Sequence, residues 1–174
     1  MAQKNNTKRL TVCAMLCALG VVLLLLGSVV EVMDIAMAAL ASLLCIFAVI
    51  EYGGAAPWLV FASTGVLSLI LLPNKTPAFM YVVFLGYYPI IKEKLERFKK
   101  PIAWLLKEVI FNVSLIALFL IVKFLLMPNA TDPLLIYAIT IVLFEVAFVL
   151  YDIALTRLIT FYIINLRHRF KFIK

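Results

Sequence analysis

Residues 10–30 form a predominantly apolar run without a single charged side chain. A helix needs about 20 such residues to cross the hydrocarbon core of a bilayer, which is about 30 Å thick. The rest of the chain has the same character, because hydrophobic residues make up 66% of its 174 residues and charged residues only 14%. A soluble domain of this length carries more charge and cannot bury so much apolar surface. The sequence therefore predicts an all-α, multi-pass protein of the cell membrane, of bacterial origin.

Polar and helix-breaking residues divide the chain into six apolar segments, each expected to be a membrane-spanning helix. These segments are 10–30, 35–50, 57–72, 78–91, 102–127 and 134–164. The second to the fourth are short for a span, so buried or re-entrant helices, and hence four or five spans, are the alternative. No domain boundary or internal repeat is visible, so residues 1–174 are predicted to form a single compact bundle.

The lysine and arginine residues favour six spans and fix the orientation. With six spans, one side of the membrane holds Lys4, Lys8, Arg9, Lys92, Lys94, Arg97, Lys99, Lys100, Arg167, Arg169, Lys171 and Lys174. The connections on the other side, 31–34, 73–77 and 128–133, contain only Lys75. Short loops rich in lysine and arginine stay in the cytoplasm, so both termini are expected inside. Five spans would place the C-terminal basic cluster outside.

Ionisable and amide side chains within the spans are candidate site residues, because a charge at the centre of a span costs about 2.5 kcal/mol or more. Glu145 is expected near the midplane, and Asn112 at a similar depth on the preceding helix. We weigh two interpretations of this pair equally: a hydrogen bond between helices, or a substrate contact at the base of a cavity. Nearer the inner face, Asp152 and Lys107 predict an ion pair that sets helix orientation.

A short loop between two prolines is expected to present a cation at the outer surface. Asn74 and Lys75 lie in this loop, with Tyr81 and Lys123 expected at the same level. A lysine acts as a point charge toward carboxylate or phosphate, which favours an anionic ligand. The alternative for a tyrosine at this level is an interfacial anchor. The predicted substrate-binding residues are Asn74, Lys75, Tyr81, Asn112, Lys123 and Glu145.

The connection after the fourth segment carries a proline followed by alternating charges. Pro89 is expected to kink or end the span, because it cannot donate to the helix ladder. Charges spaced three and four apart over residues 92–97 predict an exposed helix along the inner membrane surface, with Leu95 and Phe98 dipping into the membrane. The same stretch equally fits a docking surface for a cytoplasmic partner.

The spans carry no motif typical of catalysis. They contain no histidine, no paired carboxylates and no glycine-rich phosphate loop, and Gly53-Gly54 is an isolated pair at a helix end. Cys13, Cys17 and Cys45 lie within spans, where thiols behave as small apolar side chains. We therefore predict a protein that is not an enzyme, needs no metal or cofactor, and depends on partners for any ATP hydrolysis.

Two alanines four residues apart, in Ala14-Met-Leu-Cys-Ala18, lie on the first predicted helix. Small residues at this spacing let two helix backbones approach closely. With six spans and both termini inside, the chain resembles the substrate-binding S component of an energy-coupling factor (ECF) transporter. The resemblance covers the whole chain in size and topology, and Ala14 and Ala18 in motif.

The resemblance implies a function and a set of partners. An S component captures a vitamin or a related micronutrient near the outer face, and its alanine motif packs against a transmembrane coupling protein that sits on two ABC-type ATPases. Ala14 and Ala18 would then be partner-binding residues. Membrane lipids are further expected partners, and nucleic acid is not. No residue pattern points to one particular vitamin.

The chain is also similar to small membrane proteins of the rod-shape-determining D type, which support cell-wall synthesis. Such a scaffold would use the same alanines and basic connectors for assembly rather than for transport. An outer cavity lined by the predicted substrate-binding residues would favour the transporter, whereas lipid-facing or tightly packed side chains would favour the scaffold.

Overall fold

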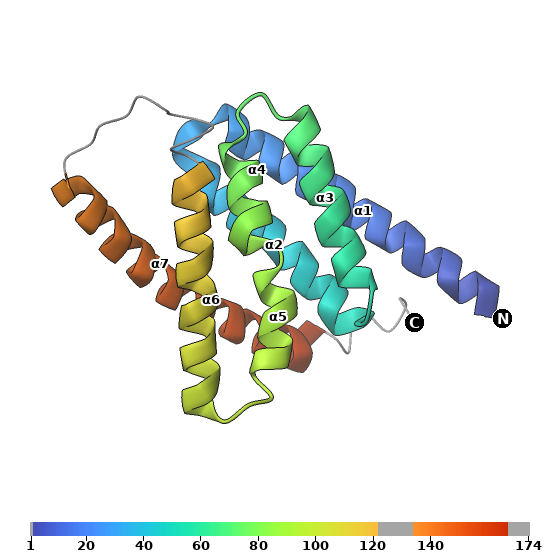
Figure 1. Cartoon of the computed structure of the whole chain (residues 1–174). Coiled ribbons are helices and arrows are strands. Elements are labelled where there is room, and N and C mark those ends of the chain that lie inside the picture. Colours follow the sequence, from blue (N-terminus) through green and yellow to red (C-terminus); the bar gives the residue numbers. More distant parts are fainter. Residues whose placement is uncertain (1, 122–133, 167–174) are drawn as a thin grey trace. The chain divides into compact units, whose positions relative to one another are not determined.

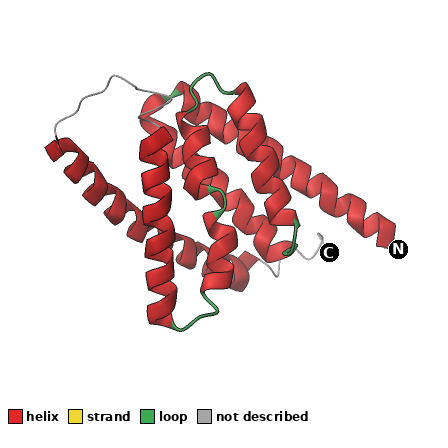
Figure 2. Ribbon diagram, in the orientation of Figure 1, coloured by secondary structure: helices red, strands yellow, loops and turns green. Residues whose placement is uncertain are grey.

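The computed structural model describes residues 2–121 and 134–166, and every regular element within these ranges is a helix (Figures 1 and 2). The chain divides into two compact units, Met1–Leu118 and Phe119–Lys174. The boundary between them falls in the last turn of a helix. Prediction of an all-helical chain is confirmed for the described residues.

The first unit holds all but one of the described α-helices. In chain order its elements are α1 (Ala2–Val29), the 3-10 turn η1 (Glu31–Met33), α2 (Asp34–Glu51), α3 (Ala56–Leu71), α4 (Thr76–Met80), the π-helical turn η2 (Tyr81–Leu85), α5 (Tyr88–Leu95) and α6 (Lys100–Ile121). The second unit contains α7 (Leu134–Phe161), which continues into the π-helical turn η4 (Tyr162–Leu166).

Four helical segments among the described residues are long and apolar enough to cross a membrane. They are Thr7–Val29, Asp34–Glu51, Lys100–Ile121 and Ile139–Asn165, with mean hydropathies between 2.0 and 2.7. α3 is apolar but shorter, at 16 residues. Length and composition thus fit a membrane protein, while the six spans and the cytoplasmic termini stay predictions.

The fourth predicted segment, 78–91, is not one continuous α-helix. α4 runs into η2, where the N–H of Gly86 donates to the carbonyl of Tyr81 at 2.7 Å, and a new helix starts at Tyr88. The break therefore precedes Pro89, which was predicted to kink or end the span. Pro89 instead lies in the first turn of α5, where its missing N–H leaves no hydrogen bond unmade.

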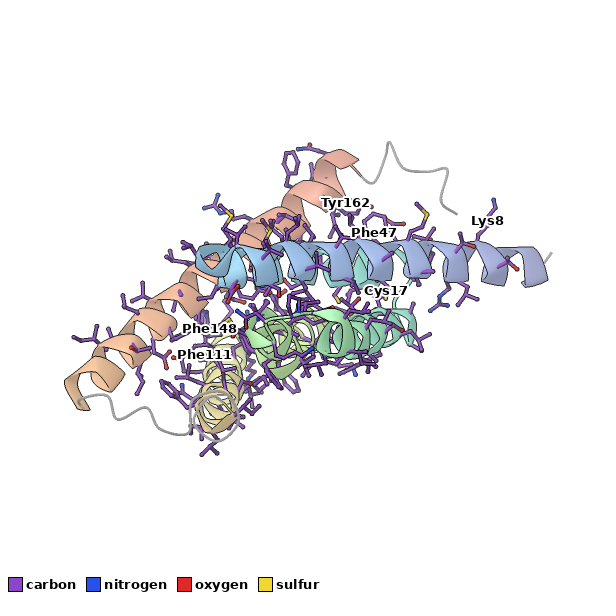
Figure 3. All side chains as sticks on the ribbon, turned by 90° about the horizontal axis from the view of Figure 1, so that it is seen from above. Lys8, Cys17, Phe47, Phe111, Phe148 and Tyr162 are labelled. Carbon is purple, nitrogen blue, oxygen red and sulfur yellow. The ribbon has the colours of Figure 1, made fainter. Side chains whose placement is uncertain are left out.

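The helices of the first unit approach one another closely at glycines. A Cβ on Gly20 of α1 would lie 2.9 Å from Cγ2 of Thr64 on α3. A Cβ on Gly65 would lie 2.8 Å from Cγ2 of Val82 in η2. Figure 3 shows the result, with α1 in one layer and α3, α4 and α6 in another. Such approach at small residues is the usual way that helices associate without a hydrophobic driving force.

Two hydrogen bonds fix which helix ends of the first unit meet. At one end the guanidinium of Arg9 donates to the carbonyl of Gly53 at 3.1 Å, in the turn between α2 and α3. At the other end the N–H of Asn74 donates to Oγ of Ser28 at 3.0 Å. These two contacts lie about 28 Å apart along α1. Arg9 and the loop that carries Lys75 therefore lie near opposite ends of α1.

Candidate functional site

The predicted outer loop, 73–77, is held by the polar groups of Asn74. Its Oδ1 accepts hydrogen bonds from the N–H of Thr76 at 3.0 Å and from its hydroxyl at 2.8 Å. Its own N–H is bound by Ser28 at the end of α1. Asn74 therefore holds the turn that precedes α4 and fastens this loop to α1, which gives the residue a structural role in addition to the predicted role in binding.

Lys75 folds back onto the end of α3. Its Nζ donates to the carbonyl of Leu72 at 2.5 Å and lies 3.4 Å from the carbonyl of Ile70. The last carbonyls of a helix lack intrahelical partners and carry the negative end of its dipole, so a cation is favoured there. This contact explains why a lysine stands in a loop that is otherwise without positive charge.

Tyr81 lies inside the first unit, not at its surface. Its side chain is fully buried, its hydroxyl is 3.1 Å from Sγ of Cys45 on α2, and its ring centroid is 5.9 Å from that of Phe61 on α3. The sequence did not predict this burial, and the expected level of Tyr81 in the membrane stays a prediction. The ring has room because Gly86 has no side chain, and a Cβ there would lie 2.8 Å from Cε1 of Tyr81.

Two hydroxyl groups on α3 were missed by the sequence analysis. Thr64 and Ser68 are buried. The hydroxyl of Thr64 interacts with that of Tyr81, whereas Ser68 Oγ has no hydrogen-bond partner among the described residues. A buried hydroxyl without a partner costs about 1–3 kcal/mol, so such groups point to a bound water or ligand. The only available signal was their spacing of four residues on an apolar helix, which many structural hydroxyls share.

The remaining predicted substrate-binding residues lie in different parts of the chain. Asn112 donates from Nδ2 to the carbonyl of Glu108 at 3.1 Å, a bond within α6. Glu145 is on α7 in the second unit, and Lys123 lies outside the described residues. Within the first unit, Asn74, Lys75 and Tyr81 each bind a different neighbour and do not face one another.

The predicted partner-binding residues lie on the outer side of α1. Ala14 and Ala18 are exposed, as are Met15 at 67% and Leu19 at 50%. The residues beside the alanines, Cys13 and Cys17, are buried, and Figure 3 shows Cys17 directed toward the neighbouring helices. The alanine pair therefore borders the buried face of α1 while remaining accessible to another helix.

The charged stretch after Pro89 is partly buried, contrary to prediction. Arg97 and Glu93 form the expected exposed pair at 2.8 Å. Lys92, however, is 0% exposed, and its Nζ lies 3.4 Å from Oε1 of Glu96, as does Nζ of the buried Lys107 on α6. α5 is thus a packed element of the first unit, tied to α6 through one carboxylate.

The described residues contain no group of three or more metal-ligating side chains. Their distinctive features are a small-residue pair on an open helix face, buried hydroxyls, and basic groups gathered at one end. No family model, curated protein or solved structure matches the chain.

Proposed function

We propose that this protein is the substrate-capture subunit of an ECF-type importer, with six membrane spans and both termini in the cytoplasm. In this proposal it binds a vitamin or a related micronutrient, and ATP hydrolysis by partner subunits drives release inside the cell. The observation that carries the proposal is the exposure of Ala14 and Ala18 on α1.

The buried positions of α1 form one stripe, made of residues 13, 17, 20, 24, 27 and 28. This stripe packs on α2 and α3. Ala14 and Ala18 lie next to it, at about 100° around the helix. A helix docked on the alanines would approach the α1 backbone closely and would border the packed face as well. A coupling protein is such a partner, because it must bind the subunit firmly without blocking its ligand site.

The proposed ligand is anionic and meets the outer end of the first unit, where Lys75 supplies a cation. In this proposal the substrate-binding residues are Asn74, Lys75, Tyr81, Asn112, Lys123 and Glu145, as the sequence predicted. The unpartnered hydroxyl of Ser68 adds a buried polar group that a ligand or water can satisfy.

A membrane scaffold of the rod-shape-determining D type is the second candidate. It is favoured by a specific observation, namely that Asn74, Lys75 and Tyr81 already have structural hydrogen-bond partners. A scaffold would use the same face of α1 to bind a cell-wall synthesis protein and would bind no micronutrient.

The deciding experiment is co-purification from detergent with the coupling protein and both ATPases of an ECF module. The unmodified chain is expected to form a stable complex that Ala14→Trp or Ala18→Trp abolishes. Ala62→Trp is the matched control, because Ala62 is also exposed but lies on α3. All these positions are exposed, so the indole ring does not have to enter the core.

Measurements of ligand affinity distinguish the proposed substrate site from the alanine face of α1 that binds the partner. Ala14→Trp is expected to leave affinity for the micronutrient unchanged, whereas Lys75→Met or Glu145→Gln is expected to weaken it without affecting the complex. A folded chain that binds no ECF subunit, or a complex that tolerates tryptophan at both alanines, would reject the transporter proposal in favour of the scaffold.

A further inference from the structure

An open pocket of about 600 Å³ lies at the Arg9 end of the first unit. It is formed between the start of α3 and the end of α5 with the turn that follows. Its walls include Trp58, Glu93, Lys94, Arg97 and Phe98. None of these residues belongs to the proposed substrate site or to the alanine face of α1.

The polar side of this pocket carries a net positive charge. Lys94 and Arg97 provide two cations against the one carboxylate of Glu93, which leaves a net charge of +1. Glu93 is already engaged by Arg97 at 2.8 Å, while Lys94 has no ion-pair partner among the described residues. Lys99 and Lys100 follow on the exposed chain just outside the pocket. The pocket therefore favours an anionic group.

The other side of the pocket is apolar and continues along α3. Trp58 and Phe98 are 39% and 56% exposed. From Trp58 the exposed positions of α3 recur at helical spacing, with Leu59 at 56%, Val66 at 57% and Ile70 at 70% exposed. A helix face of this kind suits contact with acyl chains, and aromatic rings beside basic residues are typical of the membrane–water interface.

We propose that this pocket binds the phosphate headgroup of an anionic phospholipid, whose acyl chains lie along the exposed face of α3. Lys94 and Arg97 contact the phosphate, and Trp58 and Phe98 line the first part of the acyl chains. Basic pockets between helices on the cytoplasmic side of membrane proteins bind such headgroups. An acidic protein segment would also meet the cations, but it would leave the apolar face of α3 without a role.

The two tryptophans of the chain, Trp58 and Trp104, allow a direct test. Trp104→Phe leaves Trp58 as the sole indole, and the substitution is mild because Trp104 is 43% exposed. This variant is reconstituted in phosphatidylcholine with a small fraction of lipid brominated on its acyl chains, either phosphatidylglycerol or phosphatidylcholine. Brominated phosphatidylglycerol is expected to quench Trp58 at a several-fold lower mole fraction, because each nearby cation favours an anionic lipid by about fivefold.

Two double variants that remove the same number of positive charges distinguish binding in the pocket from general attraction to an anionic membrane. Lys94→Gln with Arg97→Gln is expected to remove the preference for phosphatidylglycerol. Lys99→Gln with Lys100→Gln removes the same charge outside the pocket and is expected to keep it. Glu93→Gln releases Arg97 from its partner and is expected to strengthen the preference. Inorganic phosphate at constant ionic strength is expected not to displace the lipid.

Equal quenching by the two brominated lipids would overturn the proposal and would favour an acidic protein segment. The proposal would also be overturned if the Lys94/Arg97 and Lys99/Lys100 double variants lost the preference for phosphatidylglycerol to the same extent. The preference would then arise from surface charge alone. Displacement by inorganic phosphate would identify a soluble anion instead. Native mass spectrometry of the unmodified protein, with the same two lipids in unbrominated form, provides a check that does not depend on Trp104→Phe.

Discussion

At the scale of single residues, Lys75 combines a structural contact with a predicted role in binding. We expect Lys75→Met to lower the free energy of unfolding by about 0.3–1 kcal/mol, because a cation at the end of a helix stabilises its last carbonyls. Chemical denaturation in detergent measures this change. Lys75→Arg keeps the charge and is expected to retain most of the stability. An unchanged stability in Lys75→Met would show that the contact with Leu72 contributes nothing measurable.

Tyr81 and Cys45 form a polar contact inside the first unit. Tyr81→Phe is expected to destabilise the fold by about 1 kcal/mol, because it removes one hydrogen bond and leaves the thiol without its partner. Cys45→Ala is expected to destabilise the fold by a similar amount through loss of the hydrogen bond, and further through loss of side-chain packing. The double variant should be less destabilised than the sum of both, as measured by thermal denaturation in detergent. Strict additivity would show that the two groups do not interact.

The contrast between Arg97 and Lys92 shows what the sequence can and cannot predict for a residue. Both belong to a stretch that was expected to be an exposed helix with charges three and four residues apart, and both pair with a carboxylate four residues away, Glu93 and Glu96. The burial of Lys92 was not predicted, because spacing along one helix says nothing about which face packs on another element. The burial of Tyr81 was not predicted for the same reason, since it depends on packing against Cys45 of α2 and Phe61 of α3.

At the scale of helices, the interrupted segment α4–η2–α5 depends on Gly86. Its Cβ would lie 2.7 Å from Cδ2 of Phe61, so Gly86→Ala forces neighbouring rings to move. We expect a destabilisation of about 1–3 kcal/mol, the usual cost of overpacking a core. Thermal denaturation in detergent measures it. Phe61→Leu in the same chain should recover part of the loss, and failure to do so would place the strain at Tyr81.

Most helix boundaries were predictable, while this interruption was not. The apolar segments of the sequence lie within α1, α2, α3 and α7 to within a few residues, because hydrophobic length and glycine or proline punctuation determine them. The π-helical turn η2 depends on hydrogen bonds between residues five apart, such as that from Gly86 to Tyr81, which leave no pattern in the sequence. Pro89 signalled a break, but it lies at the start of the next helix, where proline is favoured because the N–H it lacks has no intrahelical partner there.

At the scale of the whole molecule, the orientation in the membrane is the main prediction still to be tested. A fusion of alkaline phosphatase after residue 75 is expected to be active, because that enzyme folds only outside the cytoplasm. Fluorescent-protein fusions after residue 99 and at the C-terminus are expected to fluoresce inside. The lysine and arginine distribution is the reason for both expectations. An active alkaline phosphatase fused after residue 99 instead of the fluorescent protein would contradict the six-span arrangement.

All three cysteines of the chain, Cys13, Cys17 and Cys45, are buried at 7% exposure or less. A thiol that is shielded in this way reacts with an alkylating reagent only when its surroundings open. Cys13 and Cys17 become reactive when α1 separates from α2 and α3. Cys45 becomes reactive only when the deeper contact between α2 and Tyr81 opens. The alkylation rates of these cysteines therefore measure the opening of the native protein at two depths, the packed face of α1 and the interior beside Tyr81, without an introduced label.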